Sequence, residues 1–433
     1  MLAYYFNLAL RSFRRNRALT ALMVLAIALG IGATMTTLTV FTVLSGDPLP
    51  GKSKTLFYPQ IEPRGDNIAD DEPPTQLTRF DAEALLRDAR ADRQAMMTGG
   101  NVAIEPATAG VAPFFADARY TSADFFPMFD APFRFGGGWD SSADGNRARV
   151  AVISSELNEK LFGGQDSVGR SLQMDETTFT VVGVLDQWRP VPKFYDMYSN
   201  TYGRVEQVFV PFNTSRDLDM ARSGNMNCYQ ARDEGMRDTD AGASCLWIQY
   251  WVQLDTPAKA AEYERYLVNY SEQQRAGGRF ELPPKVRLRS LMQWLDFNGV
   301  VPGDVRLQAW LAFGFLLVCL LNTVGLLLAK FLRRSGEIGV RRALGASRRE
   351  IFVQYLVEAG TIGLAGGVLG LGLAALGLWA VRQQAASYAE LAHFNPPMLL
   401  LTFVLALLAS LLAGLLPAWR AMQVTPAIQL KSQ

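Results

Sequence analysis

The stretch closest to a known chemical site is GDPLPGKS at 46–53, which fits the pattern G-x-x-x-x-G-K-[ST] of loops that cradle ATP phosphates. Such a loop needs a strand before it, a helix after it, and free backbone N–H groups aimed at phosphate. Here a long apolar run precedes it, a strand-like LFYPQI follows at 56–61, and Pro48 and Pro50 lack an N–H. We therefore predict a turn at 46–53 and no nucleotide site.

Other catalytic or metal-binding patterns are weak. The single histidine, His393, lies beside apolar residues, and a lone histidine is more often structural or solvated than a ligand. The sequence has no H-E-x-x-H, no cysteine pair at zinc spacing and no G-x-S-x-G. We expect no catalytic residue, bound cofactor or metal in this chain. The 42 basic and 41 acidic residues nearly cancel, so no nucleic-acid partner is expected.

Four apolar blocks set the framework, because a transmembrane helix needs about 20 mostly apolar residues. We predict spanning helices at 18–45, 305–330, 351–381 and 397–418. The first block is too long for a signal peptide and has no small-residue cleavage site after a short core, so we expect a retained anchor.

Lysine and arginine near the blocks predict the orientation, since cytoplasmic loops carry an excess of both. Basic residues crowd the N-terminal segment (1–17) and the loop at 331–350, and occur in the C-terminal tail (419–433), whereas the short connection at 382–396 has only Arg382. Both termini and the basic loop are therefore predicted to be cytoplasmic. The lipid bilayer is the first expected partner, and the segment at 46–304 is expected outside.

The external segment has the pattern of a mixed α+β domain. We expect a split β-α-β unit at 46–304 with an inserted β-rich subdomain at about 133–245. Within it, serines at 154–155 and glycines at 163–164 should bound a short helix, and polar residues at 175–176 should form a hairpin turn. The irregular sequence at 183–245 is interpreted as loops or an excursion from the sheet.

The external segment also holds two of the three cysteines. Cys319 lies within an apolar block and is expected to pack there, whereas Cys228 and Cys245 lie where a disulfide is chemically permitted. Spacing alone does not show whether their Cβ atoms meet, so the pair is a candidate disulfide only.

The loop between the second and third blocks is the most informative stretch. Ile338, Leu344 and Ile351 alternate with basic residues, which suits an amphipathic helix at the membrane surface. The basic residues suit contact with anionic lipid. Small residues among them, such as Gly339 and Gly345, would also let another protein approach closely. The residues alone leave both interpretations open.

The sequence GEIGVRRALGASRREI at 336–351, followed by QYLVEAG, resembles the signature of MacB/FtsX-type ABC transporter permeases. The tail LLPAWRAMQVTPAIQLK at 415–431 is similar to the closing pattern of that family. The stretch VAVISSELNEKLFGGQDSVGRSLQMDETTFTVVGVL at 150–185 resembles the MacB-type periplasmic core, and 120–140 is similar to the segment that precedes that core.

This resemblance implies a permease subunit in a bacterial inner membrane, paired with a second permease chain that is identical or a sister. Only 17 residues precede the first helix, so we expect the ABC ATPase, with its ATP and Mg, on a separate chain. The expected function is mechanotransmission, with efflux of a small compound or peptide through a periplasmic adaptor. An FtsX-like regulator of cell-wall hydrolases, a lipoprotein-extraction permease and a binding-only sensor are the alternatives. The residues expected at the ATPase contact are Glu337, Arg341, Arg342, Gly345, Arg348 and Arg349.

Small residues in the third block suggest close helix packing. Gly363 and Gly367, and Gly366 and Gly370, form small-xxx-small pairs. Packing within the subunit and contact with a second subunit are equally compatible with this spacing. Glu358 lies near the membrane edge, where it is expected to pair with a basic residue of the loop or of a partner.

Overall fold

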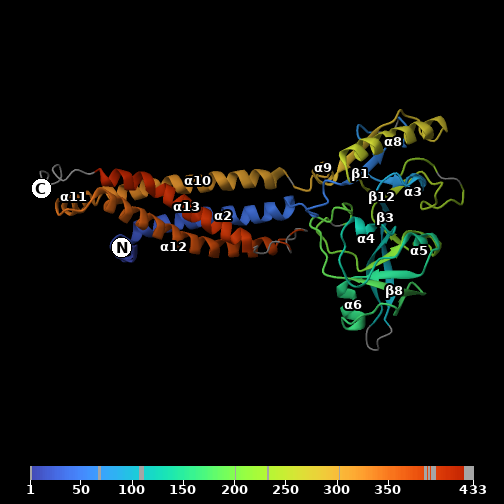
Figure 1. Cartoon of the computed structure of the whole chain (residues 1–433), viewed down its shortest axis with the longest axis horizontal. Helices are drawn as coiled ribbons and strands as arrows, with labels where there is room; N and C mark the ends of the chain where they lie inside the picture. The colour runs from blue at the N-terminus through green and yellow to red at the C-terminus, as the bar shows by residue number, and fades with distance from the viewer. Residues whose placement is uncertain are drawn as a thin grey trace. The chain divides into compact units, whose positions relative to one another are not determined.

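The computed structural model describes residues 2–66, 70–106, 112–199, 201–231, 234–301, 303–384, 388, 391 and 396–423 (Figure 1). The chain divides into two compact units. The helical unit comprises residues 1–45 and 301–433, and the sheet domain comprises residues 46–300. His393 and the tail from 424 onward lie outside the described residues.

The helical unit is built from long apolar helices that run side by side in Figure 1. Helix α12 packs against α2 and α13, and α10 packs against the same two helices. The helices are α1 (Leu2–Arg15), α2 (Arg17–Ser45), α10 (Gly303–Leu332), α11 (Ser335–Ala343), α12 (Arg348–Arg382) and α13 (Pro396–Met422).

Within the described part of the chain, three helical stretches are long and apolar enough to cross a membrane: Arg17–Ser45, Val305–Leu332 and Arg348–Arg382. The apolar part of α13 that qualifies among the described residues, Leu407–Met422, is shorter than a membrane span. The count of four spanning helices therefore stays a prediction.

The boundary between α11 and α12 follows from local chemistry. The hydroxyl of Ser347 accepts from the backbone N–H of Glu350, and the Glu350 carboxylate accepts from the N–H of Ser347, which makes a capping box. Gly345 has a φ of +101°, which residues with a Cβ rarely adopt. Gly345 therefore permits the turn between the two helices.

The sheet domain is organised around one large sheet with the strand order β13-β1-β12-β3-β4-β9-β6-β8-β5. Its strands are β1 (Leu56–Ile61), β3 (Arg93–Glu105), β4 (Phe114–Thr121), β5 (Phe133–Gly136), β6 (Val150–Ile153), β7 (Ser171–Met174), β8 (Thr177–Leu185), β9 (Val208–Pro211), β12 (Cys245–Gln253) and β13 (Val286–Ser290), with the short β2 (Leu77–Thr78), β10 (Arg222–Ser223) and β11 (Asn227–Cys228). Its helices are α3 (Arg79–Asp88), α4 (Phe125–Met128), α5 (Ser141–Gly145), α6 (Ser155–Phe162), α7 (Phe212–Asp217), α8 (Pro257–Ala276) and α9 (Leu291–Phe297).

Two local predictions in this domain are confirmed. Ser154 caps α6 by accepting from the backbone N–H of Leu157, and Gly163 ends the helix with a φ of 65°. Strands β7 and β8 form a hairpin, and both turn residues, Asp175 and Glu176, have positive φ. Positive φ at both positions matches a two-residue type I′ turn, whose twist suits a hairpin.

The segment at 133–245 differs from the expectation of a separate subdomain, because its strands continue the same sheet. Parallel pairing of β4 with β9 joins the first half of the sheet to β6, β8 and β5. The interpretation of 183–245 as loops was wrong in part, since it contains β9 and α7. Strand β9 has only four residues, all buried, and such a short apolar run carries no periodicity.

Candidate coupling site and supporting clusters

Helix α11 presents two different faces. Ile338 is 2% exposed and lies in a hydrophobic cluster with Ile351 and Tyr355 of α12. Val340 and Leu344 are 53% and 83% exposed. An apolar pair four residues apart lies on one side of a helix, so these two side chains form an outward apolar face.

The expected amphipathic helix through Ile338, Leu344 and Ile351 differs from the structure, in which α11 ends at Ala343 and α12 begins at Arg348. Positions 338 and 344 are six residues apart, which is about 240° around a helix, so they point in different directions. The signal for the outward face was present in the spacing of Val340 and Leu344, which the predicted ATPase-contact set did not include.

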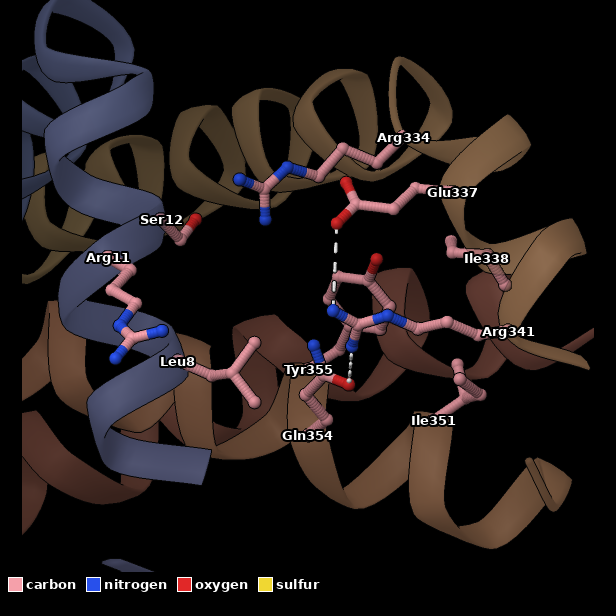
Figure 2. Close-up of a pocket in the computed structure, with 10 residues that line it drawn as sticks. All are labelled: Leu8, Arg11, Ser12, Arg334, Glu337, Ile338, Arg341, Ile351, Gln354 and Tyr355. Atoms are coloured by element: carbon pink, nitrogen blue, oxygen red, sulfur yellow. Dashed lines mark hydrogen bonds and ion pairs between the residues drawn. The ribbon is translucent and has the colours of Figure 1, made fainter. Parts of the chain in front are cut away.

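Of the six predicted contact residues, four are exposed and two are half-buried. Gly345, Arg348, Arg349 and Glu337 are exposed. Arg341 is half-buried, with its guanidinium 3.6 Å from the Glu337 carboxylate and donating to the Gln354 side chain at 2.9 Å (Figure 2). Arg342 is also half-buried, with its guanidinium 3.5 Å from the carbonyl of Met422.

Glu358 lies in a buried polar cluster that joins four helices. Its carboxylate is 2.7 Å from the ammonium group of Lys330 of α10 and accepts a hydrogen bond from the hydroxyl of Ser12 of α1. The same ammonium group is 3.3 Å from the hydroxyl of Thr20 of α2. Both charged side chains are almost fully buried, so each compensates the other in an environment that excludes water.

The glycines of α12 contact helices of this same chain. A Cβ built on Gly366 would lie 2.7 Å from a methyl group of Ile27, and one on Gly370 would lie 2.9 Å from Ile31, both residues of α2. A Cβ on Gly363 would collide with Ser410 of α13. Gly367 is buried in the same helix. These contacts favour packing within the subunit over contact with a second subunit.

In the sheet domain, a disulfide joins Cys228 of β11 to Cys245 of β12. The two cysteines are directly paired across antiparallel strands. One carboxylate oxygen of Asp238 lies 3.7 and 3.8 Å from the two sulfurs. This is the one group of potential metal-ligating residues found among the described residues. Because both sulfurs are bonded to each other, neither is the thiolate that a metal would need.

The stretch GDPLPGKS forms a turn held by its own acidic neighbours. The ammonium group of Lys52 is 2.5 Å from the Asp130 carboxylate and donates to the carbonyl of Pro127. The hydroxyl of Ser53 donates to the Asp47 carboxylate at 2.6 Å. The lysine and serine that a phosphate loop uses to bind nucleotide are therefore engaged within the domain.

A buried ion cluster stabilises the centre of the sheet domain. The guanidinium of Arg119 on β4 donates to the carboxylates of Asp196 and Glu206, and Lys193 lies 3.1 Å from Glu206. Burial alone would raise the pKa of Glu206, but Arg119 and Lys193 outweigh it and lower that pKa. For Asp196 the same two cations outweigh burial and lower its pKa as well. The two carboxylates therefore stay ionised inside the fold.

Asp144 of α5 has a different environment. One of its oxygens accepts from the backbone N–H of Ala123, while the other is buried without a hydrogen-bond partner among the described residues. Burial raises the pKa of Asp144 from its usual value of 3.8 to about 6. Among the residues that the structure describes, no cation compensates this carboxylate as Arg119 compensates Asp196 and Glu206, so its ionised form is unfavourable in the folded domain.

Comparison with known proteins adds two family matches. Residues 20–270 match the MacB-like periplasmic core domain, and residues 309–426 match the FtsX-like permease C-terminal. The macrolide export ATP-binding/permease protein MacB of Escherichia coli (strain K12) is 23% identical over 436 residues, covering 97% of this chain and 59% of that protein. The MacB protein of Shigella flexneri gives the same values. The chain thus spans about 59% of the length of these relatives.

Two solved structures are also similar to the chain. The periplasmic region of MacB from Actinobacillus actinomycetemcomitans has 12% identity and a TM-score of 0.36, and covers 58% of this chain and 94% of that structure. The extracellular domain of the noncanonic ABC-type transporter YknZ from Gram-positive bacteria has 13% identity and a TM-score of 0.34, and covers 54% and 99%. The first family match alone covers more than half of the sequence, and the second covers the helices after the sheet domain. The chain therefore belongs to the MacB/FtsX-type family of ABC transporter permeases, which are proteins of the inner membrane.

Proposed function

We propose that this chain is the membrane subunit of a MacB-like ABC transporter and that the outward face of α11 docks on an ABC ATPase carried by a separate chain. The observation that supports this proposal most strongly is the exposure of Leu344 at 83%, together with Val340 at 53%. A large exposed apolar side chain close in sequence to the exposed arginines at 348 and 349 suits insertion into a groove of another protein.

The small residues next to Leu344 support a protein partner. Ala343 and Gly345 flank it and are both exposed, so the backbone of a partner can approach closely. A Cβ on Gly345 would meet no atom within 4 Å, and the positive φ of this residue holds the turn that presents Leu344. The exposed arginines at 348 and 349 would select an acidic rim around the groove.

The family match motivates a proposal for the wider assembly. We propose that both termini and α11 are cytoplasmic and that the sheet domain is periplasmic. A second permease chain, identical or a sister, and a second ATPase would complete the transporter, with ATP and Mg bound only by the ATPases. Closure of the ATPases would move α10 and α12 through α11 and so change the posture of the sheet domain, which is mechanotransmission. Because the relatives are named for macrolide export, we propose efflux of a small compound or peptide, with a periplasmic adaptor.

The docking proposal is tested by replacing Leu344 in the full chain. Leu344→Asp should reduce the amount of ABC ATPase recovered with the tagged permease at least 10-fold, because a charge would be buried at the interface. The ATPase is identified by mass spectrometry of its phosphate-loop peptides. The melting temperature of the permease alone should not change, because the side chain lies in solvent.

Leu344→Met is the matched control, since it keeps an apolar side chain of similar volume and should keep ATPase recovery near the wild-type level. Equal recovery with Leu344→Asp and Leu344→Met would exclude this face as the docking site. If both variants lose the ATPase and both keep the wild-type melting temperature, then the apolar character of residue 344 is not sufficient for docking. The proposal would then need a specific requirement for the shape of leucine.

A further inference from the structure

A pocket of about 200 Å³ lies within the helical unit between α1, α11 and α12 (Figure 2). Its lining includes three arginines, Arg11, Arg334 and Arg341, and one acidic residue, Glu337. Arg11 comes from α1, Arg334 from the junction of α10 and α11, and Arg341 from α11. The pocket is therefore positively charged and is assembled from segments far apart in the sequence.

Two of these arginines lack a close acidic partner. Arg11 is exposed and forms no ion pair with any residue that the structure describes. Arg334 is 14% exposed, and its nearest carboxylate oxygen, on Glu358, is 3.9 Å away, which is beyond hydrogen-bond distance. The Nε–H of Arg334 is buried and has no hydrogen-bond partner within the described part of the chain.

The acidic residues near this pocket already form ion pairs with other basic residues. Glu337 faces Arg341 at 3.6 Å, and Glu358 is paired with Lys330 at 2.7 Å. Arg11 therefore has no ion pair among the described residues, and Arg334 has only the 3.9 Å contact with Glu358, a carboxylate that Lys330 already holds at 2.7 Å. A buried guanidinium donor without a partner is costly, and an anion with several acceptor oxygens would satisfy it.

The rest of the lining identifies the kind of anion. Leu8, Ile338 and Ile351 are apolar residues that line the same pocket, beside the arginines and the Tyr355 ring. The pocket adjoins the end of α10 and the start of α12, two of the helices long enough to span a membrane. A free phosphate would gain nothing from the apolar part, whereas a phospholipid offers a phosphate and apolar acyl chains together.

We propose that this pocket binds the phosphate head group of an anionic phospholipid, with Arg11 and Arg334 as its principal ligands. The bound lipid would bridge α1 to the α10–α11 junction. The proposal needs only that the helical unit is embedded in a bilayer, and it does not depend on docking of an ATPase at Leu344.

The test measures lipid binding to the purified, delipidated full chain by native mass spectrometry with phosphatidylglycerol. The double variant Arg11→Gln/Arg334→Gln should bind the first phosphatidylglycerol at least 10-fold more weakly than wild type. Arg11→Gln alone changes an exposed side chain, so it keeps the fold and should show part of this loss. Melting temperatures in zwitterionic lipid should not fall in any variant, because Arg11 has no ion pair to lose and Arg334 loses only a 3.9 Å contact together with an unsatisfied buried donor.

Arg333→Gln is the matched control, because Arg333 is an exposed neighbour that does not line the pocket. It removes the same charge and should leave the affinity within twofold of wild type. Equal losses in Arg333→Gln and the double variant would show general surface attraction and would overturn the site. If inorganic phosphate binds to the protein as tightly as phosphatidylglycerol does, the assignment to a lipid is overturned. Equal affinity for phosphatidylcholine would exclude recognition of an anionic head group.

Discussion

Buried carboxylates in the sheet domain show how a single residue can change the pH dependence of the whole fold. Asp196 and Glu206 are compensated by Arg119 and Lys193, and their pKa values are lowered. Asp144 has no such partner, and its pKa is raised to about 6 by burial. The first two carboxylates favour the folded state when ionised, whereas Asp144 favours it when protonated.

We expect Asp144→Asn to stabilise the protein at alkaline pH. A raised folded-state pKa means that the favourable contribution of Asp144 is complete below pH 3.8 and is lost as the pH rises through about 6. Asparagine carries no charge, so the variant should gain up to about 3 kcal/mol over wild type at pH 8, and this gain should vanish near pH 4. Unfolding of the full chain in detergent, followed by tryptophan fluorescence at both pH values, measures the difference.

Asp140 provides the control for this experiment, because it is the exposed cap of the same helix and its pKa is lowered by hydrogen bonds from the backbone of Ala143 and from Ser142. Asp140→Asn should show no gain at pH 8. A stabilisation by Asp144→Asn that is as large at pH 4 as at pH 8 would contradict burial as the cause of the raised pKa.

At the scale of elements, contact of α12 with α2 depends on glycines where the two backbones come close. The Cβ of an alanine at Gly366 would meet Cγ2 and Cβ of Ile27, which is β-branched and cannot easily move aside. We expect Gly366→Ala to destabilise the helical unit by about 1–3 kcal/mol through overpacking. Thermal unfolding of the full chain in detergent or nanodiscs measures this loss.

Gly372 is the matched control in the same helix, because a Cβ there would meet no atom within 4 Å. Gly372→Ala should be neutral or slightly stabilising, since alanine is the better helix former. If the two alanine variants melt at the same temperature, the close approach of α2 to Gly366 is not a determinant of stability.

The elements also show which parts of the structure the sequence could predict. The cap of α6 at Ser154 and the turn at Asp175 and Glu176 depend on neighbouring residues alone, so their sequence signals were sufficient. The partner of Gly366 could not be predicted, because small-residue spacing shows a close approach but not which helix approaches. The pairing of β4 with β9 joins residues about 90 positions apart, and no local pattern reports such a pairing.

At the coupling site, too, the local motif could be predicted from the sequence and the tertiary contacts could not. The family motif indicated α11, but the outward face depends on which side of the helix packs on Ile351 and Tyr355, and that is a tertiary property. Arg341 and Arg342 were included because the family motif covers them, yet both turn partly inward to Gln354 and Met422. The spacing of Val340 and Leu344 indicated an apolar face, but only the burial of Ile338 shows that this face points outward.

At the scale of the whole molecule, the three cysteines are divided between the two units and have different oxidation states. Cys228 and Cys245 are bonded in the sheet domain, and Cys319 is a buried free thiol in α10. Protein alkylated under denaturing conditions without reductant should therefore carry one label, and reduced protein should carry three. Intact mass measurement distinguishes the two states, and three labels before reduction would show that the disulfide is not formed.

Cys319→Ser should lower both label counts by one, which assigns the unreduced label to α10. Disulfides persist mainly in oxidising compartments. A measured count of one label before reduction would therefore support a periplasmic position for the sheet domain.

The contacts of α2 have a consequence for the order in which the protein is synthesised. Its main partners, α10 and α12, follow the sheet domain at 46–300, so at roughly 5–20 residues per second the ribosome needs about 15–60 s to supply them. We expect α2 to remain inserted during this interval without its partner helices. The hydroxyls of Thr34, Thr36 and Thr42 donate to carbonyls of the preceding turn of α2, so these polar groups need no partner from another helix. The charges of Lys330 and Glu358 enter the bilayer later, only 28 residues apart, and can neutralise each other soon after each is made.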